Sequence, residues 1–118
     1  MNTQGKVWGL TQNIFLQNNV QIDRIEAKSG GFSSKHKHLY KYNMFFLESG
    51  EIDVYVWKND YELLDITTLS PNQSTIVKPN EYHRFLAKKD SVIYEVYWTQ
   101  LNTEDIQRID VGGIKKND

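Results

Sequence analysis

The chain has 118 residues, of which 39% are hydrophobic, and its formal net charge is −1. A chain of this length usually forms a single domain, in which roughly two thirds of the surface of the unfolded chain can be buried. The absence of cysteine excludes disulfides, thiolate metal sites and thiol catalysis, and the interspersed charges form no basic stripe that would indicate nucleic acid as a partner.

The first ten residues, MNTQGKVWGL, contain neither the basic region nor the apolar region of a secretory signal. No apolar run in the chain approaches the ~18 residues that a membrane-spanning helix needs. We therefore expect a cytoplasmic protein without a membrane partner.

From residue 20 onward, apolar and polar residues alternate with a period of two, which predicts β-strands. The predicted strands begin, in chain order, at Val20, Tyr42, Glu51, Tyr61, Ser74, Glu81 and Ser91. Glycine, proline, asparagine and aspartate mark the turns between them. Seven or eight short strands separated by tight turns predict an all-β sandwich, barrel or jelly roll. One helical turn, with Asn102 or Thr103 as N-cap, is predicted near the end of the chain.

The chain contains three histidines, His36, His38 and His83. Residues i and i+2 of a strand project to the same face, so a strand would direct His36 and His38 to one interior point. His83 follows Pro79, whose fixed φ suits the entry to a third strand. Neutral imidazoles are common metal ligands, although an isolated H-x-H is more often surface decoration. The three histidines are therefore a candidate metal site if the fold brings them together.

The spacing around the first two histidines resembles a known motif. Residues 30–50 read G-x5-H-x-H-x4-N-x6-G, with Gly30, His36, His38, Asn43 and Gly50 at the fixed positions. This resembles the first cupin motif, in which a glutamate normally stands at the position of Asn43.

The segment NQSTIVKPNEYHRF resembles the second cupin motif, with Pro79 and His83 at matching positions. Asn72 and Asn80 replace the two glycines of that motif, and Ala87 replaces its final asparagine. Asparagine, like glycine, tolerates positive φ.

The resemblance extends over residues 5–113 to the cupin domain of type II mannose-6-phosphate isomerases. It is carried by an ordered set of segments: GKVWG, DRIEAKSGGFSSKHKH, SPNQSTIVKPNEYHRF, YEVYW and EDIQRIDVGG. It implies one cupin domain over residues 1–118 with a core of about residues 5–113, folded as an antiparallel jelly-roll β-barrel. It also implies that His36, His38 and His83 hold one divalent transition metal. Lys41 corresponds to the family's basic residue before its glutamate, and Glu95 corresponds to the glutamate of its I-E-V strand.

Asn43 departs from the family pattern and changes the expected chemistry. Without the usual carboxylate, three neutral imidazoles leave the charge of the ion uncompensated, so the site favours an anionic ligand. Asn43 can ligate through its amide oxygen, hydrogen-bond a bound water or cap a backbone group. The metal can be Zn, Fe, Ni, Mn or Cu, because imidazole suits many of these ions and affinity order does not decide occupancy.

The leading functional hypothesis is a metal-dependent isomerase or epimerase of a small phosphorylated sugar. Glu95 is its general base, provided that the parity of its strand turns it inward. Lys41 is a second catalytic candidate, and Lys41, Arg84 and Tyr42 are expected to contact the anionic substrate.

Two alternatives stay open. Three histidines can hold Fe(II) with open positions, as in a non-haem dioxygenase. The fold can also serve as a non-catalytic sugar-binding cupin, with Tyr40, Tyr42 and Trp57 stacking on the ligand at the barrel mouth. In each case we expect a homodimer, because exposed sheet edges favour association.

Overall fold

The computed structural model describes residues 3–58, 63–99 and 107–115. These residues form nine strands and no helix, so none of them belongs to a helix long and apolar enough to cross a membrane. The strands are β1 (Thr3–Lys6), β2 (Gly9–Gln17), β3 (Val20–Ala27), β4 (Tyr42–Ser49), β5 (Ile52–Lys58), β6 (Leu63–Leu69), β7 (Ser74–Val77), β8 (Tyr82–Ala87) and β9 (Ser91–Trp98).

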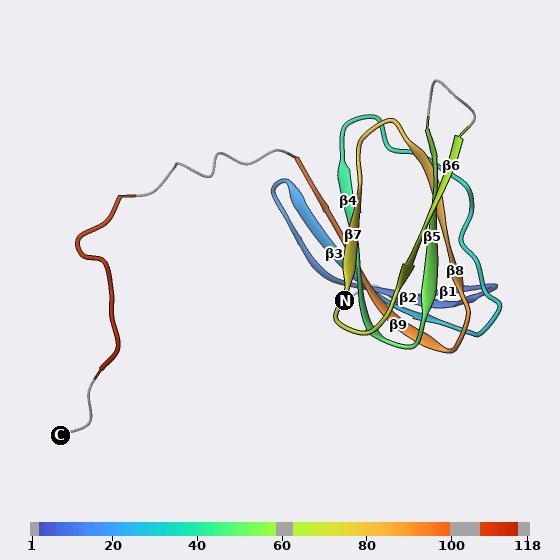
Figure 1. The fold of residues 1–118 in the computed structure, drawn as a ribbon, viewed down its shortest axis with the longest axis horizontal. Coiled ribbons are helices and arrows are strands. Elements are labelled where there is room, and N and C mark those ends of the chain that lie inside the picture. The colour runs from blue at the N-terminus through green and yellow to red at the C-terminus, as the bar shows by residue number, and fades with distance from the viewer. Residues whose placement is uncertain (1–2, 59–62, 100–106, 116–118) are drawn as a thin grey trace.

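The strands form two antiparallel sheets that face each other (Figure 1). The larger sheet has six strands in the order β1-β2-β3-β9-β4-β7, and the smaller has three in the order β6-β5-β8. This confirms the predicted all-β jelly roll. Within the described ranges no strand ladder joins the two sheets, so the barrel is open and β1, β7, β6 and β8 are edge strands. The homodimer expected from such edges stays a prediction.

Alternation along the strands separates an interior face from an exterior face. The interior face carries the apolar core, whose buried side chains are Ile25, Ala27, Phe45, Leu47, Ile52, Val54, Leu69, Val77, Phe85, Ala87 and Ile93. Asn43 on β4, His83 on β8 and Glu95 on β9 have the same parity as core residues two positions along their strands. On β4, β8 and β9, the inward-facing apolar residues of the core are therefore followed, at one end of the molecule, by inward-facing polar residues.

The turns use residues that accept positive φ. Asn72 and Asn80 have φ of 70° and 66°, a region that asparagine tolerates as glycine does. Gly50, between β4 and β5, has φ of 95°, and a Cβ there would lie 2.2 Å from the Oγ of Ser91. Any other residue at position 50 would therefore strain the backbone and collide with the end of β9.

The described segment 107–115 lies apart from the sheets (Figure 1). Within the described segment 107–115, the side chains of Ile109, Val111 and Ile114 are almost fully exposed. The helical turn predicted from Asn102 falls mostly on residues 100–106, outside the described ranges, and residues 107–110 form neither helix nor strand.

Candidate metal centre

His36 and His38 do not lie in a regular strand, contrary to the prediction from their spacing. They belong to the segment between β3 and β4, where His36 forms an isolated bridge with His83 of β8. The backbone N–H of His36 donates to the carbonyl of His83 at 3.1 Å, and that of His83 donates to the carbonyl of His36 at 2.9 Å. The backbone of His38 is held in the same way, because the N–H of Asn80 donates to the carbonyl of His38 at 2.6 Å. Backbone contacts with β8 thus position the segment without a continuous ladder.

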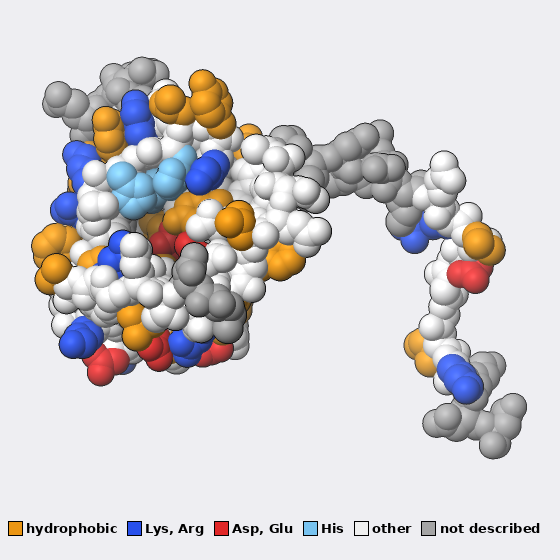
Figure 2. All heavy atoms as spheres, turned by 180° about the vertical axis from the view of Figure 1, so that it is seen from behind, with side chains coloured by type: hydrophobic (Ala, Val, Ile, Leu, Met, Phe, Trp, Pro, Cys, Tyr) orange, Lys and Arg blue, Asp and Glu red, His pale blue; other side chains and the backbone are white. Residues whose placement is uncertain are grey.

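The three imidazoles converge, and we call His36, His38 and His83 the histidine cluster. One ring nitrogen from each histidine lies within 4.8 Å of the others. The ring centroids are 4.6 Å apart for His36 and His83, 5.2 Å for His36 and His38, and 5.5 Å for His38 and His83. Figure 2 shows the histidine side chains beside a hollow in the surface, with acidic side chains deeper in it. The convergence expected from sequence is therefore confirmed.

Hydrogen bonds to backbone carbonyls orient two of the rings. The Nδ1–H of His83 donates to the carbonyl of Glu81, and that of His36 donates to the carbonyl of Ser34, both at 2.9 Å. A donating Nδ1 leaves Nε2 with a lone pair, and such partners are typical of metal-ligating histidines. The tautomer of both rings therefore suits ligation through Nε2.

His38 carries an unpaired polar atom. Its Nε2 is buried and has no hydrogen-bond partner among the described residues. Burial lowers the pKa of His38 to about 4, assisted by His36, His83 and Lys41, and burial also lowers the pKa of His83. These two imidazoles are neutral near neutral pH, which is the form that binds metal. The donor set therefore fits a divalent transition metal.

Asn43 connects the histidine cluster to Glu95. Its Nδ2 lies 3.2 Å from the Nε2 of His83 and donates to the Oε2 of Glu95 at 3.1 Å. Its Oδ1 is buried and unpaired within the described ranges. Asn43 thus bridges two side chains and caps no backbone group, and its amide nitrogen, not its oxygen, faces His83.

Glu95 points inward, so the structure settles the parity that the sequence left open. Its side chain is buried, and Oε2 accepts hydrogen bonds from Asn43 and from the hydroxyl of Tyr97. Burial raises the pKa of Glu95 to about 7, although both hydrogen bonds act in the opposite direction. A carboxyl that titrates near neutral pH is suited to move protons.

Asp23 was not predicted as a site residue. It pairs across the ladder with Glu95, and its two carboxylate oxygens accept hydrogen bonds from Asn13 at 2.9 Å and Gln21 at 3.0 Å. A signal was present in the sequence, since Asp23 has the same inward parity as the buried Ile25. A charged residue at a core-facing position marks either a strained core or a polar site.

One member of the histidine cluster, His36, lines a cavity of about 510 Å³, which we call the histidine cavity. This volume is within the range of about 300–1,000 Å³ typical of ligand sites. Its lining also includes Trp8, Asp23, Phe32, Glu95 and Tyr97. The cavity thus gives a ligand access to the imidazole of His36 and to the carboxylates of Asp23 and Glu95.

Of the three predicted substrate contacts, only Lys41 lies beside the site, with its Nζ 5.2 Å from the ring centroid of Tyr97. Tyr42 alternates with the inward-facing Asn43, and its ring stacks on Trp98.

Arg84 lies on the face of β8 opposite to His83. Its Nε donates to the carbonyl of Ser33 at 3.1 Å, and its guanidinium lies 5.1 Å from the ring centroid of Phe32. The structure therefore brings neither Arg84 nor Tyr42 to the histidine cluster.

Lys35 and Lys37 do not face the cluster. The Nζ of Lys35 lies 4.0 Å from the ring centroid of Trp57, and that of Lys37 lies 4.9 Å from the ring centroid of Tyr82. Trp57 and Tyr82 pair on the face of the smaller sheet opposite to His83. Lys41 is thus the lysine placed beside the cluster, where its positive charge attracts anions.

No family model and no curated protein matches the chain. Solved structures do. KdgF from Halomonas sp. is similar with a TM-score of 0.72 and 12% identity over 86% of this chain and 89% of that one. An RmlC-like cupin from Shewanella frigidimarina has a TM-score of 0.67 and 17% identity over 86% and 85% of the two chains. A variant of oxalate decarboxylase from Bacillus subtilis has a TM-score of 0.74 and 12% identity over 83% of this chain, but only 27% of the longer protein.

Identities this low establish the fold alone, so the closer resemblance to mannose-6-phosphate isomerases stays a prediction. What the geometry and the similar structures together establish is that the chain has the cupin fold, with a partly buried group of three histidines.

Proposed function

We propose that the protein is a mononuclear metal-binding cupin that isomerises or epimerises a small phosphorylated sugar, in the manner of a mannose-6-phosphate isomerase. One observation carries this proposal: three converging imidazoles lie next to a buried carboxyl group, and Asn43 connects the two. Metal use by a similar structure adds support, since the oxalate decarboxylase of Bacillus subtilis has Mn(II) centres.

His36, His38 and His83 would hold the ion, and Asn43 lies beside this group, with its Nδ2 3.2 Å from the Nε2 of His83. A bound divalent ion supplies Lewis acidity, which polarises a carbonyl and stabilises the negative charge of an enediolate. Zn, Fe, Ni, Mn and Cu are all compatible with this donor set.

Glu95 is the proposed general base. Both of its hydrogen bonds go to Oε2, and among the described residues Oε1 receives none, although Glu95 lines the histidine cavity. Oε1 can therefore take a proton from one carbon of the substrate and return it to the neighbouring carbon. The hydroxyl proton then moves between the two neighbouring oxygens, which balances the isomerisation. A pKa near 7 suits both directions of this transfer.

The entrance explains the preference for an anionic substrate. Lys41 stands over Tyr97 at one side of the site. A phosphate group near Lys41 would leave the hydroxylated carbons of the substrate in the histidine cavity, next to Glu95. Lys41 is the proposed phosphate contact.

The first test is elemental analysis of protein purified without chelators. We expect close to one metal ion per chain in the wild type, and a loss of metal in His83→Ala. The matched control is Tyr82→Phe, because Tyr82 is the adjacent, exposed residue of the same strand. Metal retained in His83→Ala would contradict ligation by the histidine cluster.

The second test follows exchange of the C2 proton of mannose 6-phosphate in D₂O by NMR, with the metal-loaded protein. We expect exchange in the wild type and its loss in Glu95→Gln. Oxygen uptake with Fe(II), without exchange, would instead favour the dioxygenase. Saturable sugar binding without any conversion would favour the binding module.

A further inference from the structure

We propose that a groove next to the histidine cavity binds a neutral sugar ring, so that the site accepts a disaccharide or another short glycoside whose reacting sugar lies in the histidine cavity. This inference rests on the proposed function, because it assigns the substrate class of the same site. The groove has a volume of about 410 Å³, and we call it the side groove. Its lining consists of Thr3, Gln4, Thr11, Asn13, Gln21 and Asp23.

The side groove and the histidine cavity are continuous. Gln4, Thr11 and Asp23 line both spaces, and Asp23 lies opposite Glu95 in the ladder between β3 and β9. A ligand whose reacting carbons lie next to Glu95 can therefore extend past Asp23 into the side groove. A lone monosaccharide next to Glu95 would leave the side groove empty of ligand.

The strand register explains why this region is polar. Asn13 pairs with Asp23, and Thr11 pairs with the buried Ile25, so all of them have inward parity. The facing sheet has only three strands against six, and the inward side chains of β1 and β2 line an open space. Apolar residues at these positions would be exposed, and polar residues are instead free to contact a ligand.

The polar groups are preorganised for hydroxyl groups. The amides of Asn13 and Gln21 hold both oxygens of Asp23, which fixes the carboxylate and leaves it further acceptor capacity. Within the described ranges, no hydrogen bond engages the side chains of Gln4 or Thr11. Fixed acceptors and free amide or hydroxyl groups match sugar hydroxyls, each of which both donates and accepts.

Charge distinguishes the two ends of the combined space. The side groove contains no lysine, arginine or histidine in its lining, whereas Lys41 borders the histidine cluster. A phosphate in the side groove would lie against Asp23 and be repelled. The ligand group that fits there is uncharged and polyhydroxylated, and Trp8 and Phe32 of the histidine cavity provide apolar surface for a ring face.

The experiment titrates the full-length, isotope-labelled protein with mannobiose, cellobiose and maltose, and with mannose and glucose, and follows backbone amide shifts by NMR. We expect at least one disaccharide to give saturable shifts at residues 3–6 and 11–23, with an affinity at least about tenfold above that of its monosaccharide. Absence of saturable shifts there with all three disaccharides would overturn the proposal.

Two variants locate the binding. Gln4→Ala and Thr11→Val each remove one neutral hydrogen bond, so each should weaken disaccharide binding about threefold to tenfold while monosaccharide affinity changes less than about twofold. Thr67→Val on β6 is the matched control, since it makes the same exchange on the other sheet. Equal losses for the monosaccharide and the disaccharide, or the same loss in Thr67→Val, would also overturn the proposal.

The two proposals can fail separately. A wild-type protein that binds metal and exchanges the C2 proton, yet shows no disaccharide shifts in the side groove, overturns only the side-groove proposal. A protein that binds no metal but gives the disaccharide shifts supports the side groove and contradicts the metal-dependent isomerase.

Discussion

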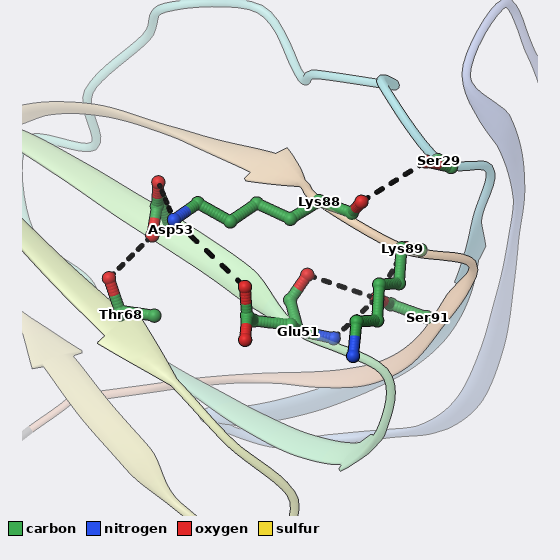
Figure 3. Close-up of polar contacts among 7 residues, drawn as sticks. All are labelled: Ser29, Glu51, Asp53, Thr68, Lys88, Lys89 and Ser91. Carbon is green, nitrogen blue, oxygen red and sulfur yellow. Dashed lines mark hydrogen bonds and ion pairs between the residues drawn. The ribbon is translucent and has the colours of Figure 1, made fainter.

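Two groups of polar residues each contain buried members, and they differ in how completely the hydrogen bonds of these members are paired. The first, which we call the Asp53 network, has seven members shown in Figure 3: Ser29, Glu51, Asp53, Thr68, Lys88, Lys89 and Ser91. The second is the histidine cluster with Asn43 and Glu95. The two groups lie at opposite ends of the ladder between β5 and β8 and on opposite faces of it.

The Asp53 network is closed. Asp53 is only 6% exposed, but its carboxylate accepts a hydrogen bond from the hydroxyl of Thr68 at 2.6 Å and pairs with the Nζ of Lys88 at 3.3 Å. Ser91 accepts from the N–H of Glu51 and donates to the carbonyl of Lys89 (Figure 3). Its two buried members, Asp53 and Ser91, thus have partners within the protein, which is the usual state of buried polar groups.

The histidine cluster is open. His38 Nε2 and Asn43 Oδ1 are buried without partners among the described residues, and Glu95 is held where its charge is disfavoured. Unpaired buried groups reduce stability unless a ligand pairs them. The comparison teaches that pairing, more than polarity or burial, separates a structural network from a binding site in this molecule.

The largest expected effect separates activity from stability at Glu95. Because Glu95 has a raised pKa and glutamine has nearly the same shape, Glu95→Gln should change the free energy of unfolding by less than about 1 kcal/mol. Loss of the general base should reduce C2 proton exchange by at least about 100-fold. NMR exchange rates and urea unfolding measure the two quantities. A parallel loss of stability would place Glu95 with the structural residues.

The next effect is the response of stability to metal. A free metal concentration of about 100 times its Kd should raise the free energy of unfolding by about 2.7 kcal/mol, because the ion binds only the folded state. His38→Ala should lose this gain, whereas Asp53→Ala should keep it. Thermal unfolding of chelator-treated protein, with and without Zn²⁺, provides the measurement. An equal gain in His38→Ala would mean that metal binds elsewhere.

A smaller effect is expected at the closed network. Asp53→Ala leaves Thr68 and Lys88 without their buried partner, and it should lower the free energy of unfolding by about 2 kcal/mol, since Lys88 can still reach water. Metal content and proton exchange should not change. Urea unfolding and elemental analysis test this, and a loss of metal in this variant would show that the two polar groups are coupled.

The smallest effect is the pH dependence of the metal-free protein. Burial lowers the pKa of His38 from 6.5 to about 4, so the unfolded chain binds more protons between these values. Stability is therefore complete above about pH 6.5 and falls as the pH approaches 4. Because the ring is partly exposed, we expect a loss of about 1–2 kcal/mol, less than the full shift implies. His38→Gln should have a flatter pH profile in urea unfolding, and an unchanged profile would assign the dependence to other groups.

Strand prediction succeeded where one face of a strand is buried. Val20–Ala27 and Ser91–Trp98 alternate because their inward residues fill the core, and both were predicted within a residue. The strands β1 and β2 were missed, since they lie at the edge of the six-stranded sheet, where most positions remain solvent-accessible and no apolar period arises. The short bridge of His36 with His83 was likewise invisible, because it depends on a partner far along the chain.

The sequence indicated which residue types belong to the site, but not the direction in which several side chains point. The histidines were identifiable because their types and spacing are rare, and the positive φ of Asn80 follows from its backbone tolerance. The outward position of Arg84 and the role of Asp23 as the partner of Glu95 depend on how strands pair. Spacing along the chain carries no information on that pairing.

The sequence by itself determined the β-rich architecture, the turn positions and the three residues able to form a metal site, because period-two patterning, backbone preference and imidazole chemistry are local properties. Only the tertiary structure decided that Glu95 faces inward, that Asn43 joins it to His83, and that Asp23 opens a polar groove beside them. The reason is physical: a one-residue shift in strand register reverses every side chain on that strand, and the register is fixed by the packing of the whole core.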